Sequence, residues 1–112
     1  MTRFFAKGRF RQRSKGPNKM ELEHFQNLEF QRQVGEVLWH APHSVGLRLA
    51  DRTFYYPDAM VMSGDDEVLE IHEVKGFWED DALVKIKVAA EMYPFRFIAW
   101  TKEKKEWKRT VI

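Results

Sequence analysis

The sequence predicts an α/β protein with a mixed β-sheet of four to five strands flanked by helices. Short runs rich in β-branched and aromatic residues alternate with two longer helical segments. One of these segments, residues 80–92, connects two apolar runs that have the length of strands. A strand, a helix and a strand in succession form a right-handed crossover, which makes the two strands parallel. The other strands follow one another through short turns, as antiparallel strands do.

The composition favours one soluble, cytoplasmic domain. The 112 residues suit a single domain, and the 44% hydrophobic share, with nine Phe, four Trp and three Tyr, can form a core. There is no cysteine, which excludes disulfides and thiolate zinc sites and fits a reducing setting. No apolar run approaches the roughly 18 residues of a membrane span, and the N-terminus lacks the apolar region of a signal peptide. We therefore expect no membrane partner.

The charges divide the chain into a flexible basic arm at residues 1–17 and a single domain at residues 18–112. Residues 1–19 hold seven Lys or Arg and no acid, whereas the remainder has twelve basic and seventeen acidic residues. Basic side chains spaced along an extended chain can follow a phosphate backbone, although a solubilising terminus is the alternative. The predicted nucleic-acid-binding residues here are Arg3, Lys7, Arg9, Arg11, Arg13, Lys15 and Lys19.

The first helix is predicted at residues 19–36. Asn18 is a candidate N-cap, and Glu21 shares a face with the apolar Leu28. An acid at the edge of a buried face could point into a functional site. Glu21 and Glu23 are equally well explained as first-turn acids that the helix dipole favours.

Two β-prone runs follow at residues 37–41 and 45–49, and residues 50–52 form a turn that could close a hairpin onto the next strand. His40 and His43 lie in this region. Two histidines three residues apart are weak support for a metal site without a third ligand. We therefore interpret both as loop or strand-edge residues.

A strand is predicted at residues 53–62, and it contains Asp58, the first of two acids that are candidates for the functional site. Period two places Asp58 on one face with Phe54 and Met60. Pro57 cannot donate to a strand ladder, so it marks a bulge, a strand edge or a bend.

The next strand, at residues 68–75, brings a second acid and a lysine. Glu73 and Lys75 share one of its faces, and residues 63–67 form an exposed turn before it. If that turn is centred between Asp65 and Asp66, then Asp58 lies directly across from Glu73, with about 5 Å between their Cβ atoms.

The C-terminal third completes the sheet. The helix at residues 80–92 is apolar over most of its circumference, which predicts that it is well buried. Pro94 ends it, and residues 95–101 form a buried strand. Residues 102–109 are charged around Trp107 and fit either a short helix or a final strand.

Two carboxylates and a lysine on one face favour a metal-dependent hydrolase. Mg²⁺ prefers oxygen ligands and is commonly held by one or two protein carboxylates together with a substrate phosphate. Asp58 and Glu73 can supply these carboxylates, and the ammonium of Lys75 can contact the scissile phosphate or the attacking water. A salt bridge between Lys75 and one acid explains two of the three groups, but it explains all three less well.

These residues match a known pattern. Tyr-Pro-Asp at residues 56–58, a hairpin, and Glu-Val-Lys-Gly at residues 73–76 closely resemble the PD-(D/E)XK nuclease signature. The stretches Asn-Lys-Met-Glu at 18–21 and Gly-Phe-Trp-Glu-Asp-Asp at 76–81 resemble those of a family of small, mostly uncharacterised phage proteins within that superfamily. The resemblance spans roughly residues 18–101 and implies a restriction-endonuclease-like core.

The resemblance also implies roles for individual residues. Asp58, Glu73 and the backbone carbonyl of Val74 would be the metal ligands, and Lys75 would be the catalytic lysine. The superfamily often adds an acid from the first helix, which Glu21 fits by position, with Glu23 as the alternative. On the helix after the motif, Lys85 or Lys87 would be the further polar residue.

The expected function is therefore a Mg²⁺-dependent DNA endonuclease, with Mn²⁺ as an alternative cation. Because little chain is left over for a sequence-reading domain, we expect selectivity for a DNA structure, such as a branch or junction, in phage recombination, repair or processing. A homodimer would suit such a substrate, since its two sites could cut two strands. The alternatives are a nucleic-acid-binding module that does not cleave and a phage interaction protein. If the protein is phage-encoded, its location would be the host cytoplasm.

Overall fold

The computed structural model describes residues 18–78 and 80–112. The predicted DNA-contacting residues of the basic arm, from Arg3 to Lys15, lie outside the described residues. The described elements, in chain order, are α2 (Lys19–Gln33), β1 (Val37–Pro42), β2 (Leu47–Ala50), β3 (Thr53–Tyr55), β4 (Ala59–Ser63), β5 (Leu69–Lys75), α3 (Asp80–Met92), β6 (Arg96–Glu103) and β7 (Glu106–Val111).

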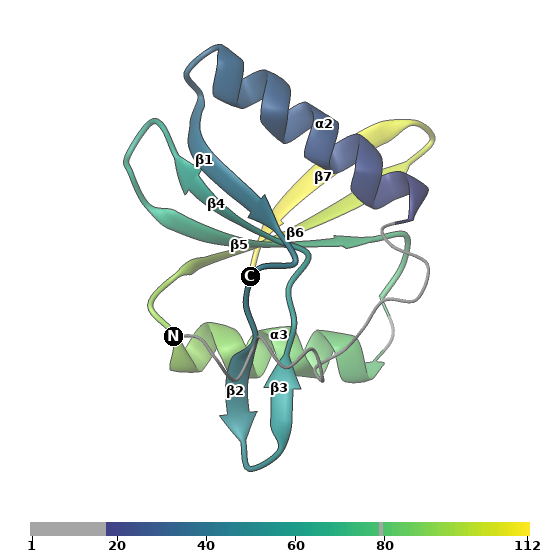
Figure 1. The fold of residues 1–112 in the computed structure, drawn as a ribbon. Helices are drawn as coiled ribbons and strands as arrows, with labels where there is room; N and C mark the ends of the chain where they lie inside the picture. The colour runs from purple at the N-terminus through teal and green to yellow at the C-terminus, as the bar shows by residue number, and fades with distance from the viewer. Residues whose placement is uncertain (1–17, 79) are drawn as a thin grey trace.

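The strands form one mixed five-stranded sheet and one separate hairpin. The sheet has the order β1-β4-β5-β6-β7, and β2 pairs with β3. Strands β5 and β6 are parallel and joined by α3, as the sequence predicts, whereas the other pairs are antiparallel. Helix α2 lies on one face of the sheet, and α3 lies on the opposite face beside the β2–β3 hairpin (Figure 1).

Each face of the sheet has its own hydrophobic cluster. Beneath α2, the buried side chains are Leu28, Val37, Ala59 and Val61. On the other face they are Leu47, Tyr55, Ile71, Ile86, Ala89 and Phe97, which join the hairpin, β5, α3 and β6. Burial of these apolar surfaces holds the two helices against the sheet.

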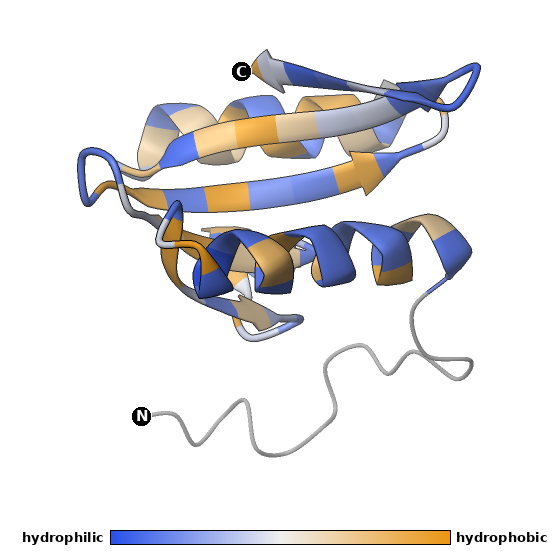
Figure 2. Ribbon diagram, turned by 90° about the horizontal axis from the view of Figure 1, so that it is seen from above, coloured by the Kyte–Doolittle hydropathy of each residue, from blue (hydrophilic) through white to orange (hydrophobic). Residues whose placement is uncertain are grey.

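Helix α2 begins where the sequence predicts and ends earlier. The backbone N–H of Glu21 donates to Asn18 Oδ1 at 2.9 Å, which confirms the predicted N-cap. The helix ends at Gln33, and Gly35 follows with a φ of +89°, a conformation that glycine adopts readily. Coloured by hydropathy, α2 is largely hydrophilic (Figure 2). Its buried residues include the polar Glu21 and His24.

The predicted strand at residues 53–62 is wrong as a single element. It is broken into β3 and β4, which belong to different sheets. Pro57 lies in the break, and because proline has no N–H to donate, the ladder cannot run through it. The predicted strand face shared by Phe54, Asp58 and Met60 is therefore also interrupted at Pro57.

Helix α3 is less buried than its composition predicts. Ile86 and Ala89 are buried, but Val84, Val88 and Met92 are 58%, 38% and 52% exposed. A helix that lies on one face of a sheet buries a single stripe, so its apolar residues elsewhere remain in solvent. Residues 106–111 form a final strand, β7, rather than a helix. Among the described residues, no helix is both long enough and apolar enough to cross a membrane.

Candidate metal centre at the end of strand β5

Asp58 lies directly before β4, beside the C-terminal end of β5. Its backbone N–H donates to the carbonyl oxygen of His72 at 3.0 Å, and its Oδ2 accepts from the backbone N–H of Val74 at 2.7 Å. Ala59 pairs with His72 in the ladder, so the same register places Asp58 opposite Glu73. This agrees with the alignment that the sequence predicts.

Glu73 is held between a tyrosine and a lysine. Tyr55 donates its hydroxyl to Glu73 Oε1 at 2.8 Å, and Lys75 Nζ lies 3.2 Å from Glu73 Oε2. Glu73 is 7% exposed, and this burial raises the pKa of its carboxyl group, although Lys75 and Tyr55 act to lower it. Burial and the charge of Glu73 also raise the pKa of Tyr55. Tyr55 therefore stays protonated and available as a donor.

The first turn of α2 brings Glu21 to the same place. Glu21 is 3% exposed, and its charge contributes to raising the pKa of Glu73. Glu23, the alternative helix acid, instead accepts from Lys102 at 2.6 Å, a bond that lowers the pKa of Glu23. The structure thus places Glu21, the acid that the resemblance favours, near Asp58 and pairs Glu23 with Lys102.

His43 lies close to Glu21 and Asp58, a position that its sequence context did not indicate. One ligand atom from each of Glu21, His43 and Asp58 lies within 4.8 Å of the others, so that the three side chains could hold a metal ion. His43 Nε2 is 3.5 Å from Glu21 Oε1. His43 lies in the turn after β1, as predicted, and the structure adds that this turn places its ring beside Glu21. His40, in contrast, contacts Glu29 at 3.0 Å, outside the cluster.

Two cavities border the cluster. One, of about 320 Å³, is lined by Phe54, Tyr55, Tyr56, Glu73, Ala82 and Lys85. The other, of about 310 Å³, is lined by Asn18, Glu21, Val74, Lys75, Gly76, Phe77 and Ala82. Lys85 thus lines the same cavity as Glu73, whereas Lys87 is exposed on α3 and lines neither cavity. Lys19 is exposed at the start of α2.

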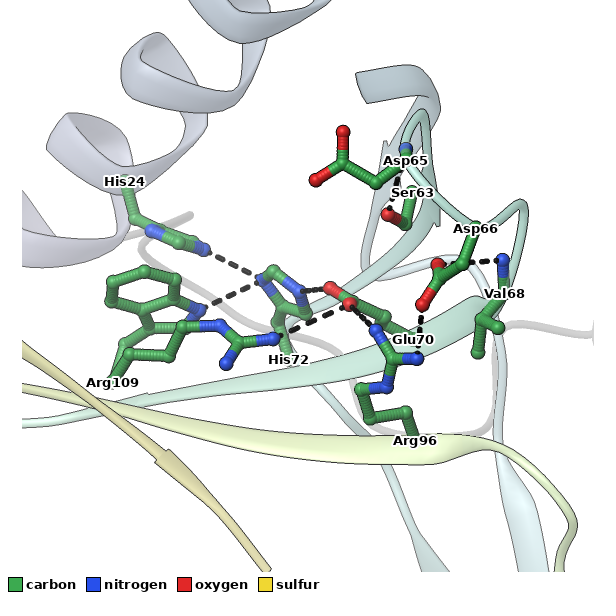
Figure 3. A network of polar contacts seen from close by, with 10 residues as sticks. His24, Ser63, Asp65, Asp66, Val68, Glu70, His72, Arg96 and Arg109 are labelled. Carbon is green, nitrogen blue, oxygen red and sulfur yellow. Dashed lines mark hydrogen bonds and ion pairs between the residues drawn. The ribbon is translucent and has the colours of Figure 1, made fainter. Parts of the chain in front are cut away.

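A polar network that includes the buried side chains of His24, Glu70 and His72 lies under α2 (Figure 3). His72 contacts His24 at 3.0 Å through its Nδ1 and Glu70 at 2.8 Å through its Nε2. Arg96 donates to Glu70 at 2.9 Å and also to Asp66. Because His72 and Glu73 are neighbours on β5, this network supports the strand that carries the candidate site.

Comparisons of the chain with protein-family models, with curated proteins and with solved structures found no match. The fold and the site thus define a small α/β protein with a mixed five-stranded sheet and an added two-stranded hairpin. Its candidate site consists of the possible metal group Glu21, His43 and Asp58, which does not include Glu73, and of the ion pair between Glu73 and Lys75 at the end of β5.

Proposed function

We propose that the protein is a metal-dependent DNA endonuclease with a restriction-endonuclease-like, PD-(D/E)XK-type site. One observation carries the proposal: Asp58 stands across from Glu73 in the strand register, and Lys75 lies beside Glu73. Buried carboxylates and a lysine are costly to hold together unless their charges are offset.

The donor atoms suit a divalent cation. Asp58, Glu73 and Glu21 offer carboxylate oxygens, the ligands that Mg²⁺ and Mn²⁺ prefer, and the carbonyl of Val74 would be a further ligand. When bound, such a cation would activate a water molecule for attack on phosphorus and offset charge on the leaving oxygen. The sequence predicts Mg²⁺, with Mn²⁺ as the alternative.

Lys75 and Tyr55 both contact Glu73, and each has a proposed role in the site. The side chain of Lys75 is 34% exposed and paired with Glu73, so its ammonium can meet a phosphate that arrives from solvent. The hydroxyl of Tyr55 holds the other oxygen of Glu73, which orients that carboxylate. Orientation of a ligand before substrate binds lowers the entropy cost of reaching the transition state.

DNA would approach along the two cavities that border the cluster. Lys85 and Lys75 stand on different cavities and can each contact a phosphate. Phe54 and Tyr56, whose rings stack at a centroid distance of 5.9 Å, line the first cavity and offer aromatic surface to an unpaired base. A base outside a duplex fits the proposed preference for branched or junction DNA.

The test is cleavage of branched, duplex and single-stranded DNA by the full chain in Mg²⁺, in Mn²⁺ and in EDTA. We expect cation-dependent cleavage, fastest on a branched substrate. Asp58→Asn and Lys75→Ala should each lower the rate by at least about a hundredfold. Asp51→Asn and Lys108→Ala, which change the same residue types at exposed positions, should leave the rate within about twofold of the wild type.

The other outcomes select other functions. Tight DNA binding without cleavage in either cation would indicate the non-cleaving nucleic-acid-binding module. If the protein neither binds nor cleaves DNA, the remaining alternative is the phage interaction protein. Sedimentation of the chain with and without a four-way junction tests the proposed homodimer, which should show twice the monomer mass.

A further inference from the structure

His43 is held beside the acids by its backbone. It follows β1 and has a φ of +45°, in the left-handed region that residues other than glycine adopt rarely. Its backbone N–H donates to the carbonyl oxygen of Asp58 at 2.8 Å. An unfavourable backbone conformation persists only where its surroundings maintain it, and such residues gather at functional sites. Here the bond to Asp58 ties the position of His43 to that of the acid.

The ring of His43 is also positioned. It meets Phe25 of α2 edge to face, with 5.8 Å between the ring centroids and an angle of 88° between the planes. Its Nε2 is directed to Glu21 Oε1 at 3.5 Å. Phe25 and Glu21 lie one turn apart on the same helix, so α2 sets both the orientation of the imidazole and its distance from the carboxylate.

The three side chains form a site that is closed on one side and open on the other. Glu21 and Asp58 are each 3% exposed, whereas the side chain of His43 is 30% exposed. An ion could therefore enter past His43 and meet two carboxylates held in the protein interior. The ligand atoms, all within 4.8 Å of one another, are close enough to bind one ion.

An imidazole nitrogen changes which ion such a site prefers. Mg²⁺ takes oxygen ligands almost entirely and retains several waters, whereas imidazole binds transition-metal ions well. For sites with nitrogen and oxygen ligands, affinity rises along the first-row series from Mn²⁺ through Co²⁺ to Ni²⁺. We propose that Glu21, His43 and Asp58 bind a divalent transition-metal ion in preference to Mg²⁺. This inference rests on the site of the proposed nuclease and names the class of its metal.

The experiment measures ion binding to the full chain without DNA, by calorimetric titration with MgCl₂, MnCl₂ and NiCl₂. The wild type should bind Ni²⁺ most tightly and Mg²⁺ least tightly. The main variant is His43→Asn, because asparagine tolerates the left-handed backbone and keeps a neutral oxygen donor. It should weaken Ni²⁺ binding by about a hundredfold and Mn²⁺ binding by about tenfold, with Mg²⁺ binding changed by less than about threefold.

His40→Asn is the matched control, since it removes an imidazole three residues away that contacts Glu29. It should leave all three affinities unchanged, and circular dichroism should show the native fold for both variants. The inference is overturned if His43→Asn retains wild-type Ni²⁺ and Mn²⁺ affinity, if the wild type binds Mg²⁺ as tightly as Ni²⁺, or if it binds none of the ions.

Cleavage assays separate this inference from the proposed function. If the protein binds Ni²⁺ through His43 but cuts no DNA in any cation, the result supports the metal site and contradicts the nuclease function. If the protein cuts DNA in Mg²⁺ but His43→Asn leaves the ion affinities unchanged, the result supports the nuclease function and contradicts the role of His43.

Discussion

His72 must carry its proton on Nε2. Trp100 Nε1, which can only donate, lies 3.1 Å from His72 Nδ1, so this nitrogen accepts. His24 then donates from its Nε2 to the same atom, and His72 Nε2 donates to Glu70 (Figure 3). A proton added to His72 Nδ1 would face two donors. This arrangement fits neutral imidazoles at both His24 and His72. Both side chains are buried, so the pH at which each one gains a proton bears on the stability of the fold.

Acid should destabilise the protein through His24. Burial is the main cause that lowers the pKa of His24 from 6.5 to about 3, and repulsion from His72 and His40, where these are protonated, lowers it further. As the pH falls from 6.5 towards 3, the unfolded chain binds a proton that the folded chain does not. The free energy of unfolding should therefore fall by up to about 1.4 kcal/mol per pH unit in this window, and the contribution should be fully present above pH 6.5. Urea denaturation at a series of pH values measures the slope.

The control for this prediction is His24→Gln. The glutamine side chain supplies an N–H donor in place of the imidazole N–H but cannot titrate. Its stability should fall less steeply between pH 6.5 and pH 4 than that of the wild type. Equal slopes for the two proteins would show that another group causes the acid sensitivity.

The turn between β4 and β5 is packed against the link between α2 and β1. The backbone N–H of Gly64 donates to the carbonyl oxygen of Glu36 at 2.9 Å. A Cβ on Gly64 would lie 2.5 Å from the carbonyl oxygen of Gly35 and 2.9 Å from backbone atoms of Glu36. Because backbone atoms cannot move aside as a flexible side chain can, only glycine fits here. The contact joins the turn that sets the β4–β5 register to the helix that supplies Glu21.

Gly64→Ala should therefore lower stability by about 1–3 kcal/mol, since the turn and the α2–β1 link must separate. Thermal denaturation measures this destabilisation. Gly76→Ala is the control, because its added Cβ would meet only Met20 Sδ, at an ordinary contact distance of 3.7 Å. A melting temperature that drops equally in both variants would contradict the specific role of Gly64.

The charges of the whole chain divide into a basic segment and an acidic body. Seven of the nineteen Lys and Arg lie in residues 1–19, and all seventeen acids lie beyond them. On a body with excess negative charge, DNA binding needs a compensating attraction. We therefore expect the proposed nuclease to depend on residues 1–19 for its affinity for DNA and on the end of β5 for its chemistry.

Deletion of residues 1–16 should weaken DNA binding and flatten its dependence on salt. The slope of log K against log salt should become shallower by about 0.9 for every phosphate that the arm no longer neutralises. Fluorescence anisotropy with labelled DNA at several salt concentrations measures both quantities. A full-length variant with Gln at the six basic positions of this segment should behave like the deletion. If affinity and slope stay at wild-type values in both, the arm takes no part in binding.

Much of this fold could be predicted because it depends on local patterns. The cap at Asn18, the crossover through α3 and the alignment of Asp58 with Glu73 follow from a capping residue, a strand–helix–strand order and the length of one turn. Each is governed by residues close together in the chain. The same holds for Lys75, which is two residues from Glu73 on one strand.

Other features depend on contacts between distant segments. His24 and His72 are 48 positions apart, and His43 meets Glu21 only because α2 packs across the sheet through Leu28. The break at Pro57 divides one β-prone run between two sheets, and no local periodicity says which sheet takes each part. The amino-acid sequence thus determined the acids, the lysine and their strand alignment. The tertiary structure placed Glu21 rather than Glu23 beside Asp58 and added His43, because the packing of a helix on a sheet sets which side chains converge.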